Sequence, residues 1–402
     1  MRVVLAPDKF KGSLTAAEVC SALADGLRRE LPEVEVVSVS VADGGDGTVA
    51  AVLDQGWQAV TTEVPGPWGD PVAATWAREP DGPGAVLEMA ASSGIALAPQ
   101  DVPSRPDDGP TRALTASTAG TGALFAAALD QGCSTIVLGV GGSATNDGGA
   151  GMLSALGARL LDASGHPVPP GAAGLESLDR VDLSGLDRRL LAAEVLLAND
   201  VDNPLTGDDG AAAVFGPQKG ADPATVARID AALARWAELL DAALPTLPEP
   251  TAGRPGRATA RGAGAAGGTG YAAMAVGAQQ VSGVDHVLDL VGLDDALEGA
   301  DLVVTGEGML DRQTLSGKAP VGVLARARRH GIPVVAVCGH RALTDAETDE
   351  VGFAAAYALT DLEPDVERCI EDPVPLLERV GGLLAGHVPP HQPPTSGREE
   401  TP

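Results

Sequence analysis

The sequence predicts an α/β protein of two domains, with a parallel-sheet domain built from both chain ends and a mixed-sheet α/β domain inserted between them. Three observations predict this. The chain has 402 residues, more than one domain usually holds. Short aliphatic runs alternate with amphipathic helical segments near both ends, as in parallel β-α-β units. In the middle, strand-like segments follow one another without helices.

The first 41 residues predict one β-α-β unit. Residues 3–6 form a short β-branched and aliphatic run, typical of a buried strand. Thr15 and Glu18 have the spacing of a capping box, in which two side chains satisfy free N–H groups at a helix start. Behind them, apolar residues recur at every fourth position and predict a helix. Residues 34–41 predict the second strand.

Further elements follow in order along the chain. Apolar runs and helical periodicity predict a helix at 119–131, strands at 136–140 and 196–198, a helix at 223–244, a strand at 302–304, a helix at 319–330 and a strand at 334–337. Each of the strands is short and aliphatic, as expected for strands that are buried on both faces.

The domain boundaries come from the spacing of these elements. Strand-like segments at 58–64, 73–78 and 85–89 are closely spaced, so the chain is expected to leave the first domain near residue 65. The Pro/Gly-rich residues 245–261 are typical of a linker or an exposed loop. We expect a discontinuous domain of residues 1–65 and 262–388, an inserted domain of residues 66–261, and a disordered Pro-rich tail of residues 389–402.

Composition excludes several classes of protein. The formal net charge is −28, which disfavours binding to nucleic acid and to anionic membranes. No run approaches the ~18 apolar residues of a membrane helix, and no signal peptide precedes the first strand, so a cytoplasmic protein is expected. The four cysteines are scattered without metal-site spacing and are expected to be buried thiols. Whether the chain assembles as a homodimer is left open by the sequence.

Lysine and asparagine are rare and unevenly placed. The chain has four lysines and three asparagines, all within or near Gly/Asp-rich turns: Lys9, Lys11, Lys219, Lys318, Asn146, Asn199 and Asn203. Asparagine suits turns for conformational reasons. Lysine has no such preference and supplies a compact positive charge that reaches phosphate oxygens. The placement of the lysines therefore favours a functional interpretation.

Two glycine-rich turns are candidates for binding anions. The first follows the strand at 136–140 and opens a helix, a geometry that presents N–H groups to an anion. Its donors are Gly141, Gly142, Ser143, Thr145 and Asn146, and Asp147 places a carboxylate among them. The second turn, residues 264–270, contains Gly267 and Gly268. Neither turn matches a Walker A motif or a dinucleotide fingerprint.

Carboxylates stand at or just beyond the ends of several predicted strands. Asp43 and Asp46 follow the second strand, Asp200 and Asp202 follow the strand at 196–198, and Glu307 follows the strand at 302–304. Ligands of open α/β sheets bind at the carboxyl ends of strands. Carboxylates there can hold Mg²⁺ beside substrate phosphates, or accept a hydroxyl proton.

Together these segments resemble the bacterial glycerate kinase family over roughly residues 1–385. The stretches that carry the resemblance are residues 6–14, 42–48, 141–151, 200–205, 215–220, 264–268 and 305–308 with 316–318. The resemblance implies transfer of the ATP γ-phosphate to D-glycerate with Mg²⁺, giving 2-phosphoglycerate rather than 3-phosphoglycerate. It also implies that the domain built from both chain ends is flavodoxin-like.

The resemblance and the strand-end positions together give hypotheses for individual residues. Lys9 and Lys11 are expected to neutralise phosphate or the glycerate carboxylate, and the two glycine turns to hold phosphates. Asp8 is expected to contact the substrate or the nucleotide. Asp200 or Asp147 is expected to act as the base or to orient the hydroxyl. Glu307 and Lys318 would complete the nucleotide and substrate site, and the metal candidates are Asp43, Asp46 and Asp202.

The chain departs from the family pattern at four positions. The family often has Tyr and Glu where this chain has Ala119 and Ala123, Cys where it has Asn199, and a basic residue where it has Met309. Two alternatives therefore stay open. One is a kinase for a related hydroxy or sugar acid. The other is a regulator that binds ATP or glycerate without turnover.

Overall fold

The computed structural model describes residues 1–98, 108–247 and 257–388. These residues divide into two compact units: a terminal unit of residues 1–42 and 288–388, and an inserted unit made from residues 43–287. The predicted fold class is confirmed, because the terminal unit holds a parallel sheet from both chain ends and the inserted unit holds a mixed sheet. The predicted disordered tail lies outside the described residues.

The predicted boundaries at 65/66 and 261/262 differ from this division. Strand β3 (Gln58–Pro65) pairs antiparallel with β4 (Pro71–Arg78), so the mixed sheet begins before residue 66. Strand β10 (Gln279–Val281) pairs with β9 (Glu194–Ala198), so the inserted unit continues past residue 262. The sequence pattern identifies both segments as strands, but it carries no information about which sheet each strand joins.

The sheet of the terminal unit is parallel throughout, as its described strands show. Its spatial order is β13 (Ala355–Ala358), β12 (Val334–Arg341), β11 (Leu302–Leu310), β1 (Arg2–Pro7) and β2 (Glu35–Ser38). The three central strands are aliphatic and almost fully buried for most of their length. This burial is expected of a parallel sheet covered on both faces.

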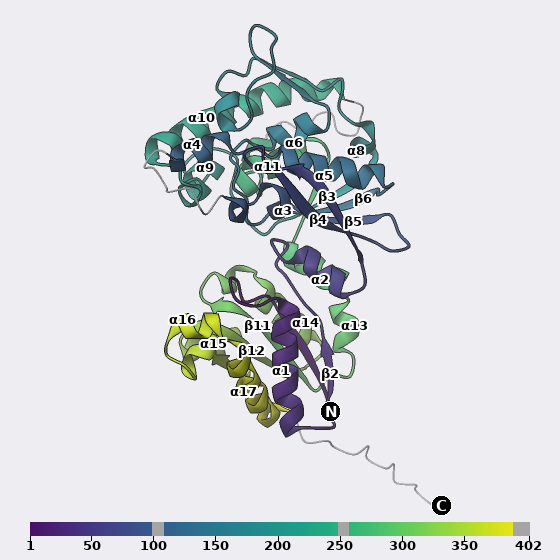
Figure 1. Cartoon of the computed structure of the whole chain (residues 1–402), viewed down its shortest axis with the longest axis vertical. Helices are drawn as coiled ribbons and strands as arrows, with labels where there is room; N and C mark the ends of the chain where they lie inside the picture. Colours follow the sequence, from purple (N-terminus) through teal and green to yellow (C-terminus); the bar gives the residue numbers. More distant parts are fainter. Residues whose placement is uncertain (99–107, 248–256, 389–402) are drawn as a thin grey trace, which may run out of the picture. The chain divides into compact units, whose positions relative to one another are not determined.

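Helices cover both faces of this sheet. On one face, α1 (Ala16–Glu30) and α17 (Val374–Leu384) pack on the strands, and Figure 1 shows the two helices side by side. Helix α14 (Ala319–Arg329) also packs on β1, β11 and β12. The capping box of Thr15 and Glu18 is present at the start of α1, as predicted. The remaining helices are α13 (Leu293–Leu297), α15 (Asp345–Val351) and α16 (Val366–Glu371).

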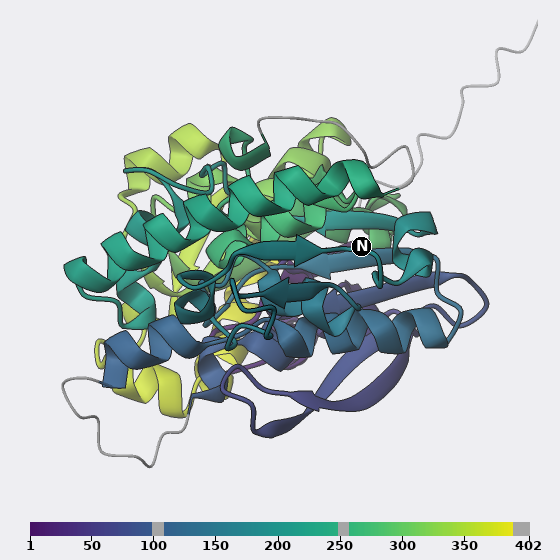
Figure 2. The same ribbon diagram turned by 90° about the horizontal axis from the view of Figure 1, so that it is seen from above.

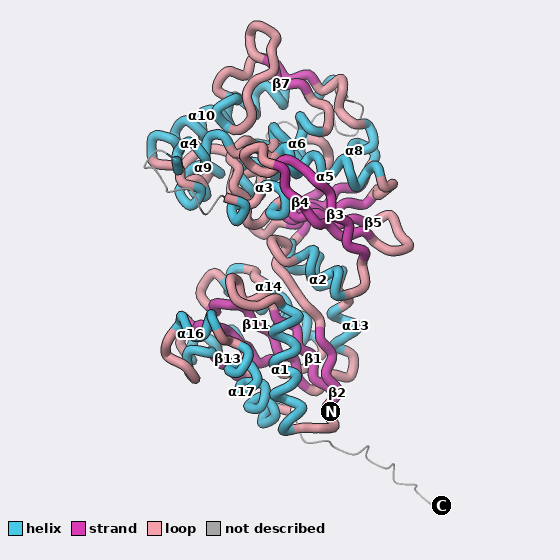
Figure 3. Tube along the Cα trace, viewed as in Figure 1, coloured by secondary structure: helices cyan, strands magenta, loops and turns pink. Residues whose placement is uncertain are grey.

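The inserted unit contains a mixed sheet, drawn in magenta in the upper part of Figure 3. The spatial order is β10, β9, β6 (Thr135–Gly139), β5 (Gly84–Glu88), β4 and β3. Strands β5, β6, β9 and β10 are parallel, and β3 and β4 form an antiparallel hairpin at the edge, blue-violet in Figure 2. A small second sheet pairs β7 (Arg159–Leu161) with β8 (Arg180–Asp182).

The helices of the inserted unit surround this sheet and enclose the larger core. The longest is α10 (Pro223–Ala243), and α12 (Gly283–Leu290) spans the division between the units. The others are α2 (Thr48–Asp54), α3 (Ala90–Ser93), α4 (Asp108–Thr115), α5 (Ala119–Asp130), α6 (Ala150–Ala155), α7 (Ala172–Leu175), α8 (Arg188–Ala192), α9 (Ala211–Phe215) and α11 (Ala265–Ala275).

The four cysteines are free and buried, as predicted. None of the helices that the structure describes combines the length and the apolar character needed to cross a bilayer.

Candidate functional site

In the terminal unit, Asp8, Lys9 and Lys11 follow strand β1, and Gly306 of β11 pairs with the last residue of β1. The backbone N–H of Asp8 donates to the carbonyl oxygen of Gly306 at 2.8 Å. The Asp8 carboxylate accepts the N–H of Lys9 at 2.6 Å. The turn that carries the two lysines is therefore fixed to the carboxyl end of the sheet, as the sequence predicted for a binding edge.

Glu307 and Lys318 meet at the same edge. The ammonium of Lys318 lies 3.1 Å from Oε2 of Glu307, and the hydroxyl of Thr314 donates to Oε1 at 2.6 Å. Glu307 is buried, whereas about a third of the Lys318 side chain is exposed. The carboxylate therefore holds a partly exposed ammonium. Glu307 was expected to follow the strand at 302–304, but β11 continues to Leu310, so this residue lies within the strand, one position beyond the last residue that pairs with β1.

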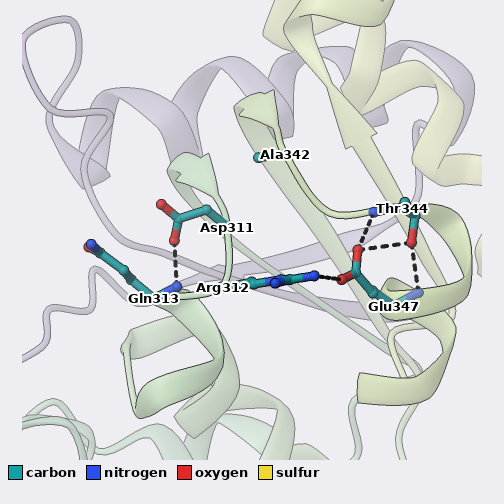
Figure 4. Close-up of a pocket in the computed structure, with 6 residues that line it drawn as sticks. All are labelled: Asp311, Arg312, Gln313, Ala342, Thr344 and Glu347. Atoms are coloured by element: carbon teal, nitrogen blue, oxygen red, sulfur yellow. Dashed lines mark hydrogen bonds and ion pairs between the residues drawn. The ribbon is translucent and has the colours of Figure 1, made fainter.

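A surface hollow of about 730 Å³ lies next to this edge. Figure 4 shows that Arg312 reaches across it to Glu347, at 3.0 Å, while Asp311 and Gln313 lie on the opposite side. The pKa of Glu347 is lowered to about 2. The largest cause is the hydrogen bond from the backbone N–H of Thr344, followed by those from the Thr344 hydroxyl and from Arg312. Arg312 and Glu347 thus neutralise each other, and the carboxylate of Asp311 accepts the backbone N–H groups of Gln313 and Thr314, so we assign no ligand to the hollow.

In the inserted unit, the first glycine turn (residues 141–149) joins β6 to α6. Gly142 is exposed and Gly141 is partly exposed, and the rest of the turn is buried. The N–H of Gly148 donates to the carbonyl of Gly267 at 2.9 Å, and the indole of Trp236 donates to the carbonyl of Gly148 at 2.9 Å. The predicted phosphate donors Ser143, Thr145 and Asn146 lie in the buried part of the turn.

Asp147 is at the centre of this turn and is fully buried. Its carboxylate accepts four hydrogen bonds: from the N–H and hydroxyl of Thr118 at 2.8 and 3.0 Å, and from the N–H groups of Gly149 and Gly151, both at 3.2 Å. Burial raises the pKa of Asp147, and these donors oppose the rise. Because its oxygens face inward, the geometry argues against the predicted role as base and favours an anchoring role.

The second glycine turn (residues 264–270) packs directly on the first. Ala266, Gly267 and Gly268 have φ values of 52°, 67° and 91°, so three successive residues are left-handed. A Cβ on Gly267 would lie 1.9 Å from the carbonyl oxygen of Thr145. In this turn, Gly267 and Gly268 serve the close approach of two backbones.

The loop that begins at Asp43 is organised by a residue that the sequence analysis missed. Glu88, the last residue of β5, is buried and accepts the N–H groups of Gly47 at 2.9 Å and Val49 at 2.6 Å, at the start of α2. Gly45 of the same loop lies against Gly141 of the first glycine turn. A signal was present in the sequence, since Glu88 is the single charged residue of an otherwise apolar strand.

Replacing Glu88 with alanine is expected to lower the free energy of unfolding by about 3 kcal/mol, because the buried N–H of Val49 and the part-buried N–H of Gly47 lose their acceptor. Chemical denaturation measures this loss. Asp162 is the matched control, since its carboxylate also accepts two backbone N–H groups, those of Ser164 and His166, but at the surface. Water replaces the acceptor there, so Asp162→Ala should cost about 1 kcal/mol or less. Equal losses in the two variants would contradict the assigned role of Glu88.

Asp200 follows β9 and remains exposed. Its carboxylate oxygens accept the N–H groups of Gly283 at 2.9 Å and Val284 at 3.1 Å, at the start of α12. Partial burial raises the pKa of Asp200, and the nearby charge of Asp43 adds to the rise. Asp43 and Asp200 are therefore close enough for their charges to interact, and both lie at the carboxyl end of the mixed sheet.

The metal candidates differ in how well they fit a cation. Asp202 is paired through both carboxylate oxygens with Arg261, which leaves it poorly suited to bind a metal. Oδ1 of Asp43 accepts the N–H of Gly45 at 3.1 Å, and the Asp43 carboxylate is close enough to Asp200 for the two charges to interact. Across the described ranges, no group of three or more His, Cys, Asp or Glu side chains could hold a metal ion. One or two carboxylates are, however, sufficient for Mg²⁺ when phosphates supply further ligands.

Lys219 is the second residue missed as a site candidate, although its rarity drew attention to it. Its ammonium is buried and donates to the carbonyl oxygen of Thr145 at 2.6 Å. Burial lowers the pKa of Lys219 to about 7, and the charge of Asp147 opposes this shift.

Comparisons with known proteins agree with the resemblance drawn from the motifs. A family model described as the glycerate kinase family matches residues 3–387. The glycerate kinase of Bacillus subtilis (strain 168) is 40% identical over 96% of this chain and 98% of its own length. The glycerate 2-kinase of Escherichia coli (strain K12) is 42% identical over 89% of each chain. A Salmonella typhimurium LT2 crystal structure that carries the name glycerate kinase 2 superposes with a TM-score of 0.77 at 40% identity, covering 96% of this chain and 98% of that one.

Proposed function

Since this chain belongs to the glycerate kinase family and is an ATP-dependent kinase, we propose that it transfers the γ-phosphate of ATP to the C2 hydroxyl of D-glycerate. The products are 2-phosphoglycerate and ADP. The assignment to C2 is favoured by the identity to the E. coli relative named glycerate 2-kinase.

The observation that carries the proposal within the chain is the placement of Asp200. Two N–H groups hold its carboxylate at the carboxyl end of β9, and the side chain stays exposed. A carboxylate in this position accepts the proton of the glycerate hydroxyl as that oxygen attacks the γ-phosphorus. Asp147 is buried by comparison, so the role of base falls to Asp200.

The remaining requirement of phosphoryl transfer is neutralisation of charge. In the terminal unit, Lys9 and Lys11 supply ammonium groups just after β1, and Lys318 supplies one beside Glu307 of β11. They are proposed to bind the ATP phosphates or the glycerate carboxylate. In the inserted unit, Gly141 and Gly142 form the accessible part of the first glycine turn and are proposed to contact a phosphate through their backbone.

Magnesium is proposed as the metal cofactor, with Asp43 as its protein ligand and Asp46 as a further candidate. When bound, the ion would neutralise negative charge on the phosphates. Asp202 is left out of this set because its carboxylate is paired with Arg261.

The experiment that tests the proposal is ³¹P NMR of a reaction containing the protein, Mg-ATP and D-glycerate, with L-glycerate as the control. We expect signals of ADP and 2-phosphoglycerate. A signal of 3-phosphoglycerate would contradict the C2 assignment and leave the kinase intact. Turnover of other hydroxy or sugar acids but not of glycerate would favour a kinase for a related acid. ATP binding without ADP formation from any of them would favour a regulator.

A further inference from the structure

Lys219 carries a charge in a place where a core residue would be apolar. It ends the 3₁₀ turn Pro217–Lys219, just before α10, and its side chain is buried in the inserted unit. A buried ammonium is costly unless partners satisfy it. Burial indeed lowers the pKa of this lysine to about 7. Charged groups held against their preference for water are more typical of functional sites than of packed cores.

The partners of Lys219 belong to the first glycine turn. The ammonium donates to the carbonyl oxygen of Thr145 at 2.6 Å, across 74 positions in the sequence. The carboxylate of Asp147 is near enough to offset its charge. Asp147 in turn accepts hydrogen bonds from the N–H groups of Gly149, which precedes α6, and Gly151, in the first turn of α6. Lys219 therefore acts on the backbone and on the anchoring carboxylate of the same turn.

The side chains of Thr145 and Asn146 do not fix the backbone of the turn in the same way. The hydroxyl of Thr145 and the carbonyl oxygen of the Asn146 side chain are both buried, and neither has a hydrogen-bond partner. The Asn146 amide donates to the carbonyl of Ala113 at 3.1 Å. At Thr145, the middle of the turn, the bond from Lys219 is thus the side-chain contact that fixes the backbone carbonyl.

We propose that Lys219 is a positioning residue of the active site, which fixes the first glycine turn through Thr145 and Asp147 and thereby sets where Gly141 and Gly142 present their backbone. This role rests on the proposed function, because those two glycines are the part of the turn assigned to a phosphate. Lys219 itself does not touch the substrate. Its effect is exerted on the orientation of the group that does.

The test compares Lys219→Met, which removes the charge and the donor, with Lys219→Arg, which keeps both. Leu190→Ala is the control, since Leu190 is buried in the same core but belongs to α8. For each variant we would measure Tm, the kcat and KM for both substrates, and hydrogen–deuterium exchange of peptides covering residues 141–151. Displacement of a reacting group by about 1 Å can cost about 100-fold in rate.

We expect Lys219→Met to lower kcat by about 10- to 100-fold, to speed exchange in residues 141–151, and to be partly rescued by Lys219→Arg. Leu190→Ala should lower Tm while keeping kcat and the exchange of this segment. An unchanged kcat and unchanged exchange in Lys219→Met would overturn the proposal. So would a loss of activity that only follows the loss of Tm, as in the control. If Lys219→Met does not fold, Lys219→Arg decides: slower turnover together with faster exchange of residues 141–151 at a retained Tm supports the role, and slower turnover with wild-type exchange overturns it.

The exchange measurement needs no turnover, so it separates this proposal from the proposed reaction. A wild-type protein that does not phosphorylate glycerate would contradict the proposed function. Faster exchange of residues 141–151 in Lys219→Met alone would then still support the structural half of the inference.

Discussion

Replacing Asp200 with asparagine is expected to lower kcat by about 10²- to 10⁴-fold, the usual range for removal of a general base. Asparagine keeps one oxygen that can accept the N–H of Gly283 at the start of α12, but its amide nitrogen cannot accept the N–H of Val284. The substitution therefore removes the charge and the proton acceptor together with one of the two hydrogen bonds to α12. Steady-state kinetics with D-glycerate measure the loss, and thermal denaturation checks that the variant is folded at the assay temperature.

Asp222 provides the matched control. Its carboxylate caps α10 of the same unit by accepting the N–H of Thr225 at 2.7 Å, and it is exposed. Asp222→Asn makes the same chemical change at a helix start with no proposed role in the reaction. Its kcat should equal that of the wild type. A wild-type kcat in Asp200→Asn, or an equal loss in both variants, would show that Asp200 is not the base.

The fold could be predicted from the sequence because its signals are local. The aliphatic runs at residues 3–6 and 302–304 and the capping box at Thr15 follow from the preferences of neighbouring residues. The domain boundaries depend on pairing between strands that are distant in the chain. Strand β10 joins β9, some 80 residues earlier in the sequence, and nothing in the sequence of β10 indicates that partner.

The same distinction applies to the site. Asp200 was singled out by a local signal, a charged residue just after an aliphatic strand, and Lys318 by its rarity beside a glycine turn. The strand pattern placed Glu307 after residue 304, whereas β11 continues through it to Leu310. The burial of Asp147 could not be predicted, since it depends on Trp236 and on the second glycine turn, which are remote in sequence. A glycine-rich turn has the same composition whether it cradles a phosphate or accommodates a second backbone.

The free energy of unfolding of a Gly267 variant shows which of these two uses applies to Gly267. Gly267→Ala is expected to lower the free energy of unfolding by about 2–5 kcal/mol, from about 1–2 for a left-handed residue with a Cβ and about 1–3 for overpacking. The physical reason is that the new methyl group would lie 1.9 Å from the carbonyl oxygen of Thr145 and 2.8 Å from the Cα of Asn146. The backbone of the first glycine turn would have to move.

Gly132 separates the two contributions. It has a φ of 81°, close to the 67° of Gly267, but a Cβ there would meet nothing within 4 Å. Gly132→Ala should therefore cost only the conformational part, about 1–2 kcal/mol. Urea denaturation of both variants measures the difference, which is the energy of the close contact between the two turns. If the two losses are equal, the contact contributes nothing, and Gly267 is free to serve a ligand as the sequence first suggested.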